Sequence, residues 1–387
     1  MMAGANIVIA GAAESSETGT VTNLSAMGLA VDAARRALAD CGLTAADVDG
    51  VAMASLTPYA VVELAAAMGI EPRWVDATMV GGCSNLVHVR HAAAAIAAGQ
   101  CEVVLVAHGE SGRSHIGGPR FARSADSLAG QFELPYGTAG PMSLLSLGTM
   151  RFLADRGLGR EALGQVVATQ RRWAAHNPRA VRRDPITVEE VLASKPVVEP
   201  FTRPMCCVVT DAGGALVVTS AERAATLHGT PVGLLGAGES TGTALASQMP
   251  DLTSSDAFRR SGAAAFADAG IGPDDVDHAM LYDALAILPL MALEDLGFVE
   301  RGGSGRFWND GHTGPGGRLP VNTSGGGLNY THSGMYGMYA VLESVRQLRG
   351  EAAAQVDGVR TSVVHAIGGM FQAAATLVLG AGSPAAH

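Results

Sequence analysis

Short apolar segments alternate with alanine-rich amphipathic segments along most of the chain. The apolar runs at 51–54, 103–106, 279–282 and 362–365 contain no charged residue. Each follows a predicted helix that ends at a glycine, the residue type that most often ends a helix. Uncharged strands alternating with amphipathic helices predict buried parallel sheets covered by helices, and therefore an α/β fold.

One part of this pattern occurs twice. Residues 37–49 read ALADCGLTAADVD and residues 265–277 read AFADAGIGPDDVD, with seven of thirteen positions identical at an offset of 228. Each copy ends a predicted helix and is followed by a turn and an apolar strand. A period of over 200 residues indicates duplicated domains rather than a solenoid.

The later elements keep the same order in both halves. A Gly-rich turn at 81–83 precedes a helix and a strand in the first half, and the turn at 324–327 precedes a helix over about 334–348 in the second. We therefore predict an N-terminal half at 1–225 and a C-terminal half at 226–387.

An insertion at roughly 112–200 interrupts the first half and holds much of the irregular polar sequence. Arginines concentrate there in an otherwise acidic chain, and guanidinium groups suit phosphate recognition. A phosphate site is one interpretation, and a solvated helix face is the alternative for any single residue. The arginines are Arg171, Arg172, Arg179, Arg182 and Arg183.

Composition excludes several classes of protein. The 387 residues are 48% hydrophobic and 16% charged, which excludes a disordered chain, and the 50 glycines follow no period of three. The net charge of −10 argues against nucleic acid or an anionic membrane as the main partner. No uncharged apolar run of about 18 residues is present, so no membrane span is expected.

The five cysteines, an odd number without a CxxC pair, do not form a disulfide framework or a zinc site. The first thirteen residues lack the pattern of a secretory signal. We expect a reduced, cytoplasmic protein with no metal in this chain. Lys195 is the only lysine, so Schiff-base chemistry would depend on that residue alone.

Cys83 stands where the first Gly-rich turn opens a helix. Free backbone N–H groups and the helix dipole at such a position favour a thiolate, so we expect a lowered thiol pKa and a nucleophile. The Gly81-Gly82 turn would let a substrate carbonyl approach the backbone. The other four cysteines lie in apolar or helical runs and are interpreted as structural.

A cysteine nucleophile needs a proton acceptor, and the second half offers two histidines. His332 follows the Gly-rich turn and His365 ends a strand. Tyr282 and Tyr330 occupy a strand end and the Gly-rich loop, where either could donate a hydrogen bond to an enolate. Half-buried packing is the alternative for each tyrosine. The chain contains no P-loop, strand-linked GxGxxG, HExxH or GxSxG motif.

These segments resemble the thiolase superfamily, specifically its lipid-transfer-protein or sterol-carrier-type branch. The segments are GGCSNLVHVRHAAAAIAAG (81–99), LYDALAILPLMALEDLGF (281–298), GGRLPVNTSGGGLNYTHSGMYG (316–337) and VVHAIGGMFQAAATLVLG (363–380). The resemblance covers essentially the whole chain. It implies duplicated half-domains in a five-layered αβαβα thiolase fold, with an inserted loop domain that lies over coenzyme A.

The resemblance also implies roles for individual residues. Cys83 matches the acyl-accepting nucleophile, and His332 matches the histidine that activates it and helps to form an oxyanion hole. His365 stands where most thiolases have a second cysteine, the acid/base of the Claisen step, and where sterol-carrier-type members have a histidine. For coenzyme A we expect contacts from Arg171, Arg172, Arg182, Gly326 and Gly369.

The chain also departs from the thiolase pattern. The turn reads HSGMYG instead of HPLGASG, and Tyr282 replaces a histidine or an asparagine. Steroid side-chain aldolases of the same branch resemble this chain across 281–350. They have tyrosines at the positions of Tyr282 and Tyr330 and lack a cysteine at position 83.

Three functions follow from this resemblance. The leading prediction is a thiolase-like acyltransferase that makes or breaks a carbon–carbon bond in a 3-ketoacyl-CoA through a Cys83 acyl-enzyme. The alternative is a retro-aldolase that cleaves a 3-hydroxyacyl-CoA with Tyr282 and Tyr330. The third is a non-catalytic lipid-binding or scaffold subunit. Implied partners are a second copy of the chain and a small OB-fold, zinc-ribbon protein.

Overall fold

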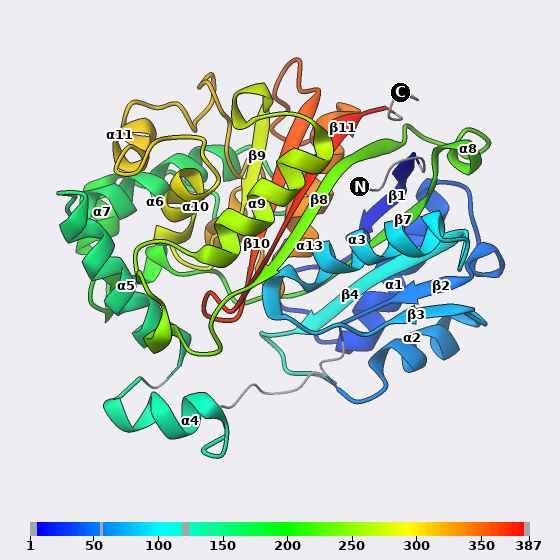
Figure 1. Cartoon of the computed structure of the whole chain (residues 1–387), viewed down its shortest axis with the longest axis horizontal. Coiled ribbons are helices and arrows are strands. Elements are labelled where there is room, and N and C mark those ends of the chain that lie inside the picture. The colour runs from blue at the N-terminus through cyan, green and yellow to red at the C-terminus, as the bar shows by residue number, and fades with distance from the viewer. Residues whose placement is uncertain (1–5, 55–56, 118–123, 139, 383–387) are drawn as a thin grey trace.

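The computed structural model describes residues 6–54, 57–117, 124–138 and 140–382 (Figure 1). Nine strands form one mixed sheet in the order β3-β2-β4-β7-β1-β8-β11-β10-β9. The strands are β1 (Ile7–Glu14), β2 (Gly50–Ala52), β3 (Trp74–Asp76), β4 (Val103–Ser111), β7 (Asp211–Ser220), β8 (Val232–Thr241), β9 (His278–Leu281), β10 (Thr361–Gly368) and β11 (Ala373–Ala381).

The α/β class is confirmed, and the sheet is mixed where the sequence predicted parallel sheets. β2 runs parallel to β3 and β4, and β9 runs parallel to β10. β7 and β11, the last strands of the two halves, run antiparallel to both of their neighbours, and the β1–β8 pair is antiparallel as well. The halves join through a short β1–β8 pairing at Val8–Gly233 and Ile9–Val232.

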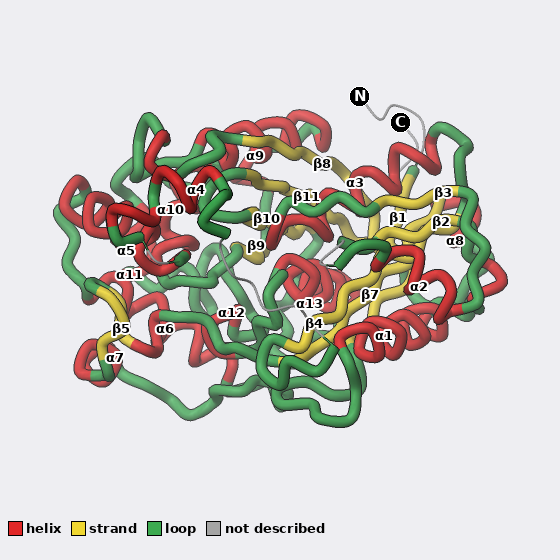
Figure 2. The backbone as a smooth tube through the Cα atoms, turned by 90° about the horizontal axis from the view of Figure 1, so that it is seen from below, coloured by secondary structure: helices red, strands yellow, loops and turns green. Residues whose placement is uncertain are grey.

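Helices surround and separate the two halves of the sheet in five layers (Figure 2). α1 covers β1, β4 and β7 on one outer face, and α9 covers β8 and β11 on the other. α3 and α13 lie between the halves and contact strands of both. The helices of this layered body are α1 (Ala26–Asp40), α2 (Ala60–Met68), α3 (Ser84–Ala97), α8 (Ala221–Ala224), α9 (Asp256–Ala269), α10 (Ile287–Asp295), α11 (Ser304–Asn309), α12 (Gly326–Asn329) and α13 (Gly337–Arg349).

The repeated aspartates explain why both halves fold alike. Asp49 accepts hydrogen bonds from the amides that open β4, and Asp277 accepts them from the amides that open β10. Asp40 binds the amide of Ala12 on β1, and Asp268 binds the amide of Ala237 on β8. The repeat in the sequence is therefore a repeat of hydrogen bonds between a helix–turn unit and its sheet.

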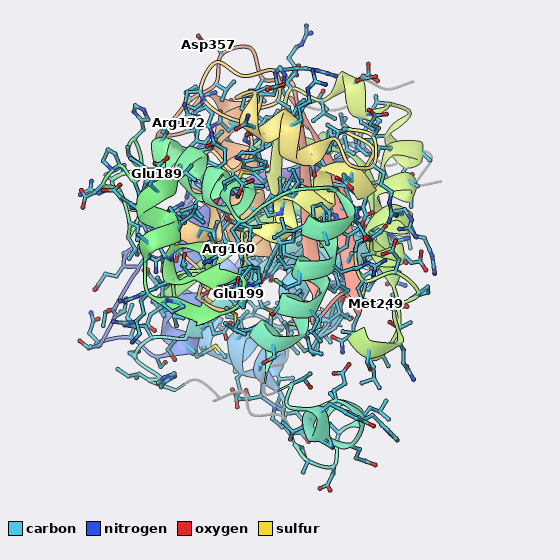
Figure 3. All side chains as sticks on the ribbon, turned by 90° about the vertical axis from the view of Figure 1, so that its left-hand side faces the viewer. Arg160, Arg172, Glu189, Glu199, Met249 and Asp357 are labelled. Atoms are coloured by element: carbon cyan, nitrogen blue, oxygen red, sulfur yellow. The ribbon has the colours of Figure 1, made fainter. Side chains whose placement is uncertain are left out.

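The insertion predicted at 112–200 forms a separate group of helices and a two-stranded hairpin beside the layered body. An ion pair of 3.7 Å between Arg160 and Glu199 joins the start of α6 to the hairpin, and Figure 3 looks onto this face. The elements are α4 (Leu128–Phe132), α5 (Pro141–Asp155), α6 (Glu161–Ala174), α7 (Val188–Ala193), β5 (Pro196–Val198) and β6 (Phe201–Thr202).

The hydrophobic core has two parts. One lies between the N-terminal half of the sheet and its outer helices α1 and α2. The other is larger and includes the central helices, the C-terminal strands and the base of the insertion. Within the described residues, no helix has both the length and the apolar character needed to cross a membrane.

Candidate active site

A cavity of about 360 Å³ lies where the two halves meet the insertion. Its wall is mainly apolar, and its polar side chains are few: Glu110, Tyr282, His332 and the thiol of Cys207. A mostly apolar cavity with a few convergent polar groups is the usual form of a small-molecule site. The remaining wall residues are Met79, Gly81, Gly82, Met142, Leu145, Ala284, Leu285, Leu288, Gly334, Met335, Ile367, Gly369 and Met370.

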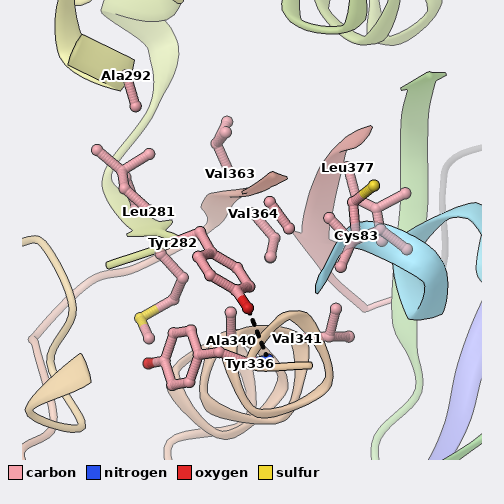
Figure 4. Packing of buried hydrophobic residues seen from close by; sticks show 14 of the residues in the cluster. Cys83, Leu281, Tyr282, Ala292, Tyr336, Ala340, Val341, Val363, Val364 and Leu377 are labelled. Atoms are coloured by element: carbon pink, nitrogen blue, oxygen red, sulfur yellow. Dashed lines mark hydrogen bonds between the residues drawn. The ribbon is translucent and has the colours of Figure 1, made fainter. Parts of the chain in front are cut away.

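Tyr282 directly follows β9, and its phenol enters the cavity. The phenol oxygen lies 3.1 Å from Nε2 of His332 and 3.2 Å from the carbonyl oxygen of Gly334. The backbone N–H of Tyr336 donates to the same oxygen at 3.4 Å, as Figure 4 shows. Burial raises the pKa of Tyr282, so the side chain stays a neutral phenol and can donate a hydrogen bond.

His332 is held beside Tyr282 by its loop. Its backbone N–H donates to Oγ1 of Thr210 at 3.0 Å, and its ring stacks on Tyr336 with an interplanar angle of 8°. Burial lowers the pKa of His332 to about 4, because a charged imidazolium would lose its hydration. At neutral pH the pair is therefore a neutral imidazole against a neutral phenol.

Glu110 is a site residue that sequence reasoning missed. It lies near the end of β4, is 5% exposed and lines the cavity. Its Oε2 has no hydrogen-bond partner among the described residues, and burial raises the pKa of the carboxyl to about 8. A signal existed in the sequence: Glu110 is the only acidic residue in the apolar strand VVLVAHGES.

Cys83 does not have the environment that the sequence predicted. It lies at the start of α3 as expected, but its thiol is fully buried and faces the carbonyl oxygen of Val80 at 3.5 Å. Burial raises its pKa to about 12, so the expected lowering of the pKa is wrong. The loss of hydration on burial raises the thiol pKa by more than the helix dipole lowers it. In Figure 4, Cys83 lies beside Leu377, away from the phenol of Tyr282.

Cys207 is a cysteine that does line the cavity. Burial raises its pKa to about 12 as well, so it is not a ready thiolate. Neither cysteine therefore places an ionised nucleophile in the cavity at neutral pH.

His365 lies outside the cavity wall, among side chains under α9. Its Nδ1 is 2.8 Å from Oγ1 of Thr376, and its ring meets the ring of Phe258 edge-on at 4.4 Å. Burial lowers its pKa to about 3. The structure thus does not bring His365 together with Tyr282 and His332.

Tyr330 is also separated from the cavity. Its phenol donates a hydrogen bond to Oε2 of Glu14. Arg346 and Arg179 contact the same carboxylate at 2.6 and 3.0 Å. Tyr330 thus belongs to a buried ion-pair network, does not line the cavity, and forms no hydrogen bond with Tyr282 among the described residues.

The predicted coenzyme A arginines have different environments. Arg171 is buried and donates to Oδ1 of Asn329 and to the carbonyl of Asp184, so its guanidinium is engaged in the fold. Arg172 is exposed on α6 and labelled in Figure 3. Arg182 is partly buried and donates to two carbonyl groups; burial and the nearby Arg203 lower its pKa.

The two predicted glycine contacts also differ. Gly369 lines the cavity, and its contact with coenzyme A stays a prediction. Gly326 lies against Asp283, which accepts the backbone N–H groups of Gly327 and Leu328 at 2.6 and 3.2 Å. The Gly-rich turn therefore directs these N–H groups at a carboxyl of the fold and not at a phosphate.

This arrangement favours acid–base chemistry. The cavity combines a phenol, a neutral imidazole and a carboxyl group, and its mostly apolar wall strengthens hydrogen bonds made inside it.

The comparisons with known proteins agree with this fold. The thiolase C-terminal domain-like family matches residues 238–381. The chain is 34% identical over 353 residues to the 17-hydroxy-3-oxo-4-pregnene-20-carboxyl-CoA lyase of Mycobacterium tuberculosis, covering 87% of this chain and 90% of the lyase. It is 30% identical over 361 residues to the acetyl-CoA acetyltransferase of Methanothermobacter thermautotrophicus, covering 91% and 93% of the two chains.

A solved structure described as an Ltp2-ChsH2(DUF35) aldolase superposes on nearly the whole chain. The TM-score is 0.91 at 32% sequence identity, and the match covers 98% of this chain and 99% of that one.

Proposed function

The chain belongs to the thiolase superfamily, in the sterol-carrier-type branch near the steroid side-chain-cleaving aldolases, and on this premise we propose that it is a retro-aldolase. Its substrate would be a 3-hydroxyacyl-CoA. One observation carries the proposal: the Tyr282–His332 pair lines the cavity, whereas the thiol of Cys83 is buried outside it with a raised pKa.

A retro-aldol cleavage moves one proton and one electron pair. The 3-hydroxyl loses its proton, the bond between carbons 2 and 3 breaks, and carbon 3 leaves as an aldehyde or ketone. The bond electrons pass to the thioester as an enolate, which then takes a proton at carbon 2. The protein must therefore stabilise an enolate oxygen and provide a base.

Tyr282 is suited to stabilise the enolate. The Tyr336 N–H donates to its oxygen, and His332 does the same when Nε2 carries the imidazole hydrogen. The phenol hydrogen is then free to leave the Gly334 carbonyl and bind the thioester oxygen. Donors already aimed at a developing oxyanion supply a large share of catalysis in such sites.

The wall of the cavity indicates the kind of acyl group. Met79, Met142, Met335 and Met370 contribute flexible apolar side chains, and such side chains adapt to irregular ligand shapes. We propose a bulky apolar acyl group of the class named in the mycobacterial lyase, a steroid carboxyl-CoA.

The coenzyme A end of the substrate would pass the insertion. Arg182 and Arg203 lie near each other beside Cys206 and Cys207, and in the described part of the chain neither forms an ion pair with a carboxylate. Two neighbouring guanidinium groups without an acidic partner suit a phosphate. The exposed Arg172 lies on the same insertion.

Acyl transfer through Cys83 is the second candidate. Cys83 directly follows Gly82, which lines the cavity, and the archaeal acetyltransferase is 30% identical to this chain. In that reaction free coenzyme A is consumed and an acyl-enzyme forms on sulfur, neither of which occurs in a retro-aldol cleavage.

Two protein partners are part of the proposal. The similar solved structure is described as an aldolase with a DUF35 component, so we propose a DUF35-type partner for this chain. We also propose a homodimer. Among the described strands, β3 pairs only with β2, and Val75 on this edge strand is 51% exposed, so a second copy could extend the sheet there.

The decisive assay incubates the chain, with and without a DUF35 partner, with a panel of 3-hydroxyacyl-CoAs. We expect a carbonyl product and a shortened acyl-CoA without consumption of free coenzyme A. Tyr282→Phe should lower kcat by about 10²- to 10³-fold, because the enolate loses a hydrogen-bond donor. Tyr136→Phe, at an 85% exposed tyrosine, is the matched control. Carbon–carbon cleavage that strictly requires free coenzyme A would contradict the proposal.

A further inference from the structure

We propose that Glu110 is the catalytic base of this site and carries the proton from the 3-hydroxyl to carbon 2. The inference rests on the proposed retro-aldol function and supplies the base which that reaction requires. Three observations carry it. The carboxyl lines the cavity, and its Oε2 has no hydrogen-bond partner among the described residues. Gly334, in the loop that carries His332, has no side chain and so leaves space for the carboxyl.

The environment of Glu110 differs from that of a structural carboxylate. Glu14 is similarly buried, but Arg346, Arg179 and the Tyr330 phenol all contact it. Glu110 has no arginine within ion-pair distance in the described chain. Its nearest basic group is Nε2 of His108 at 3.9 Å, and burial lowers the pKa of that imidazole to about 3, so it is neutral. A buried carboxyl group without a cation beside it lowers the stability of the fold, so its presence in an apolar wall indicates a function.

Gly334 places the carboxyl beside the phenol. This residue has a φ of +141°, and an added Cβ would lie 2.1 Å from Oε2 of Glu110. The carbonyl of the same glycine accepts the Tyr282 phenol at 3.2 Å. The base and the proposed enolate donor thus flank one backbone residue, so that a substrate between them would meet both.

The proton balance closes with this single group. The Glu110 carboxylate removes the 3-hydroxyl proton while the bond between carbons 2 and 3 breaks and the Tyr282 phenol binds the enolate oxygen. The protonated Glu110 then returns the same proton to carbon 2, and the carboxylate is restored. No oxidant, metal or free coenzyme A takes part.

The titration of Glu110 should be visible in the rate. Burial raises its pKa to about 8, so the ionised base, and with it kcat/KM, should increase as the pH rises through about 8. The titratable groups that face it stay neutral around this pH, because burial raises the pKa values of the phenols and the thiol and lowers those of the imidazoles. They are His108 on β4, Tyr282 after β9, His332 in the loop, Tyr339 on α13 and Cys207 in the wall.

The test compares Glu110→Gln with Glu343→Gln, a buried carboxyl outside the cavity that accepts from Thr323 and Gln347. We expect Glu110→Gln to lower kcat by about 10²- to 10⁴-fold and to remove the rise near pH 8. Glu343→Gln should keep both. Glu110→Asp should retain part of the rate with a displaced pH profile. Circular dichroism and urea unfolding confirm that each variant folds.

A second measurement separates this inference from the proposed function. In D₂O, wild-type protein should exchange the carbon-2 hydrogens of the shortened acyl-CoA, since the same base and enolate are used in reverse. Exchange that disappears in Glu110→Gln supports the base even if no 3-hydroxyacyl-CoA in the panel is cleaved. Active wild type and an equally active Glu110→Gln variant would overturn the inference alone. Absence of both cleavage and exchange in the wild type would overturn both proposals.

Discussion

Glu14, Glu110 and Cys83 are all buried, but their surroundings give each a different chemistry. Burial alone would raise the pKa of Glu14, yet Arg346 and Arg179 bring it below its ordinary value and keep the group charged. Glu110 has no such cation, so its pKa rises to about 8. Cys83 is desolvated to the point that its pKa rises to about 12. Residue type alone does not distinguish these cases; the neighbours do.

Cys83→Ala tests whether the thiol is needed. A retro-aldol reaction does not use it, so we expect cleavage of a 3-hydroxyacyl-CoA within about threefold of wild type, with a loss of about 1–2 kcal/mol of stability from the small cavity. Cys41→Ala, at an equally buried thiol on the far side of the N-terminal sheet, is the control. A labelled acyl group on Cys83, found by mass spectrometry and required for turnover, would favour acyl transfer instead.

Tyr330→Phe tests the placement of this tyrosine outside the cavity. Glu14 would lose one of its buried donors, so we expect a decrease of about 1–3 kcal/mol in the free energy of unfolding, measured with urea. The rate of cleavage per folded molecule should stay unchanged. A folded variant of normal stability that had lost cleavage would show that Tyr330 takes part in the chemistry.

At the scale of elements, the repeated aspartates connect each helix–turn unit to the sheet. Asp277→Ala removes the acceptor of the Arg360 and Thr361 amides. We expect a loss of about 1–2 kcal/mol in the free energy of unfolding. Asp274→Ala, in the same turn, removes only an exposed ion pair with Arg318 and should cost less than about 0.5 kcal/mol. Equal costs for the two variants would contradict the role of Asp277.

His91 on α3 connects the edge strand β3 to β8. Its Nδ1 is 2.7 Å from Asp76, and its Nε2 is 3.3 Å from Glu239. Hydrogen bonds to Asp76 and Glu239 raise its pKa to about 9. Since the folded-state pKa exceeds that of the unfolded chain, this contribution is complete below about pH 6.5 and is lost as the pH rises through about 9.

The difference in unfolding free energy between wild type and His91→Gln should therefore be larger at pH 6 than at pH 9.5, as measured by urea denaturation. Using the difference removes the contribution of all other titrating groups. A difference that did not change with pH would show that His91 is not charged in the folded protein.

The sequence predicted the elements better than the site. Alternating strands and helices, glycine stops such as Gly350 and the 228-residue repeat all depend on local patterns, and the structure has them. The sequence did not predict the antiparallel direction of β7 and β11, because a buried apolar strand has the same side-chain pattern in either direction. His365 was assigned to the site because it ends a strand and stands where most thiolases have a second cysteine, but its imidazole contacts Thr376 and Phe258 and does not line the cavity.

Glu110 was missed for a different reason. Its position as the only acidic residue of an apolar strand is visible in the sequence, but the lack of a partner for its Oε2 among residues of distant segments is not. Tyr282 and His332 were found because Gly-rich loops and strand ends are visible in the sequence. The sequence did not show that the side chains of Tyr282 and His332 lie within hydrogen-bond distance of each other. It also did not show that Tyr330, two residues before His332, donates its hydrogen bond to Glu14.

At the scale of the whole molecule, the cavity takes its groups from both halves. Glu110 comes from the N-terminal half, and Tyr282 and His332 from the C-terminal half, while the insertion contributes Met142 and Leu145. The chemistry therefore depends on how the halves pack across α3 and α13, and neither half holds all three polar groups.

The proposed homodimer can be tested at the edge strand. Val75→Lys places a charge on the exposed edge of β3, so we expect the variant to remain a monomer near the chain mass of 39.3 kDa. Wild type should have twice that mass in light scattering coupled to size exclusion. Val197→Lys, at an equally exposed valine of the insertion, is the control. A wild type that is already monomeric would contradict the dimer.

The paired aspartates that open β4 and β10 also align Glu110 with Gly368, seven residues after Val103 and Thr361 respectively. An added Cβ at Gly368 would lie 1.8 Å from the Val80 carbonyl, so this position cannot hold the acid that its counterpart holds. The two halves of the sheet therefore share an equivalent position but not its chemistry. One position carries a carboxyl group at the cavity, and the other has no side chain, so the backbone of Val80 packs closely against it.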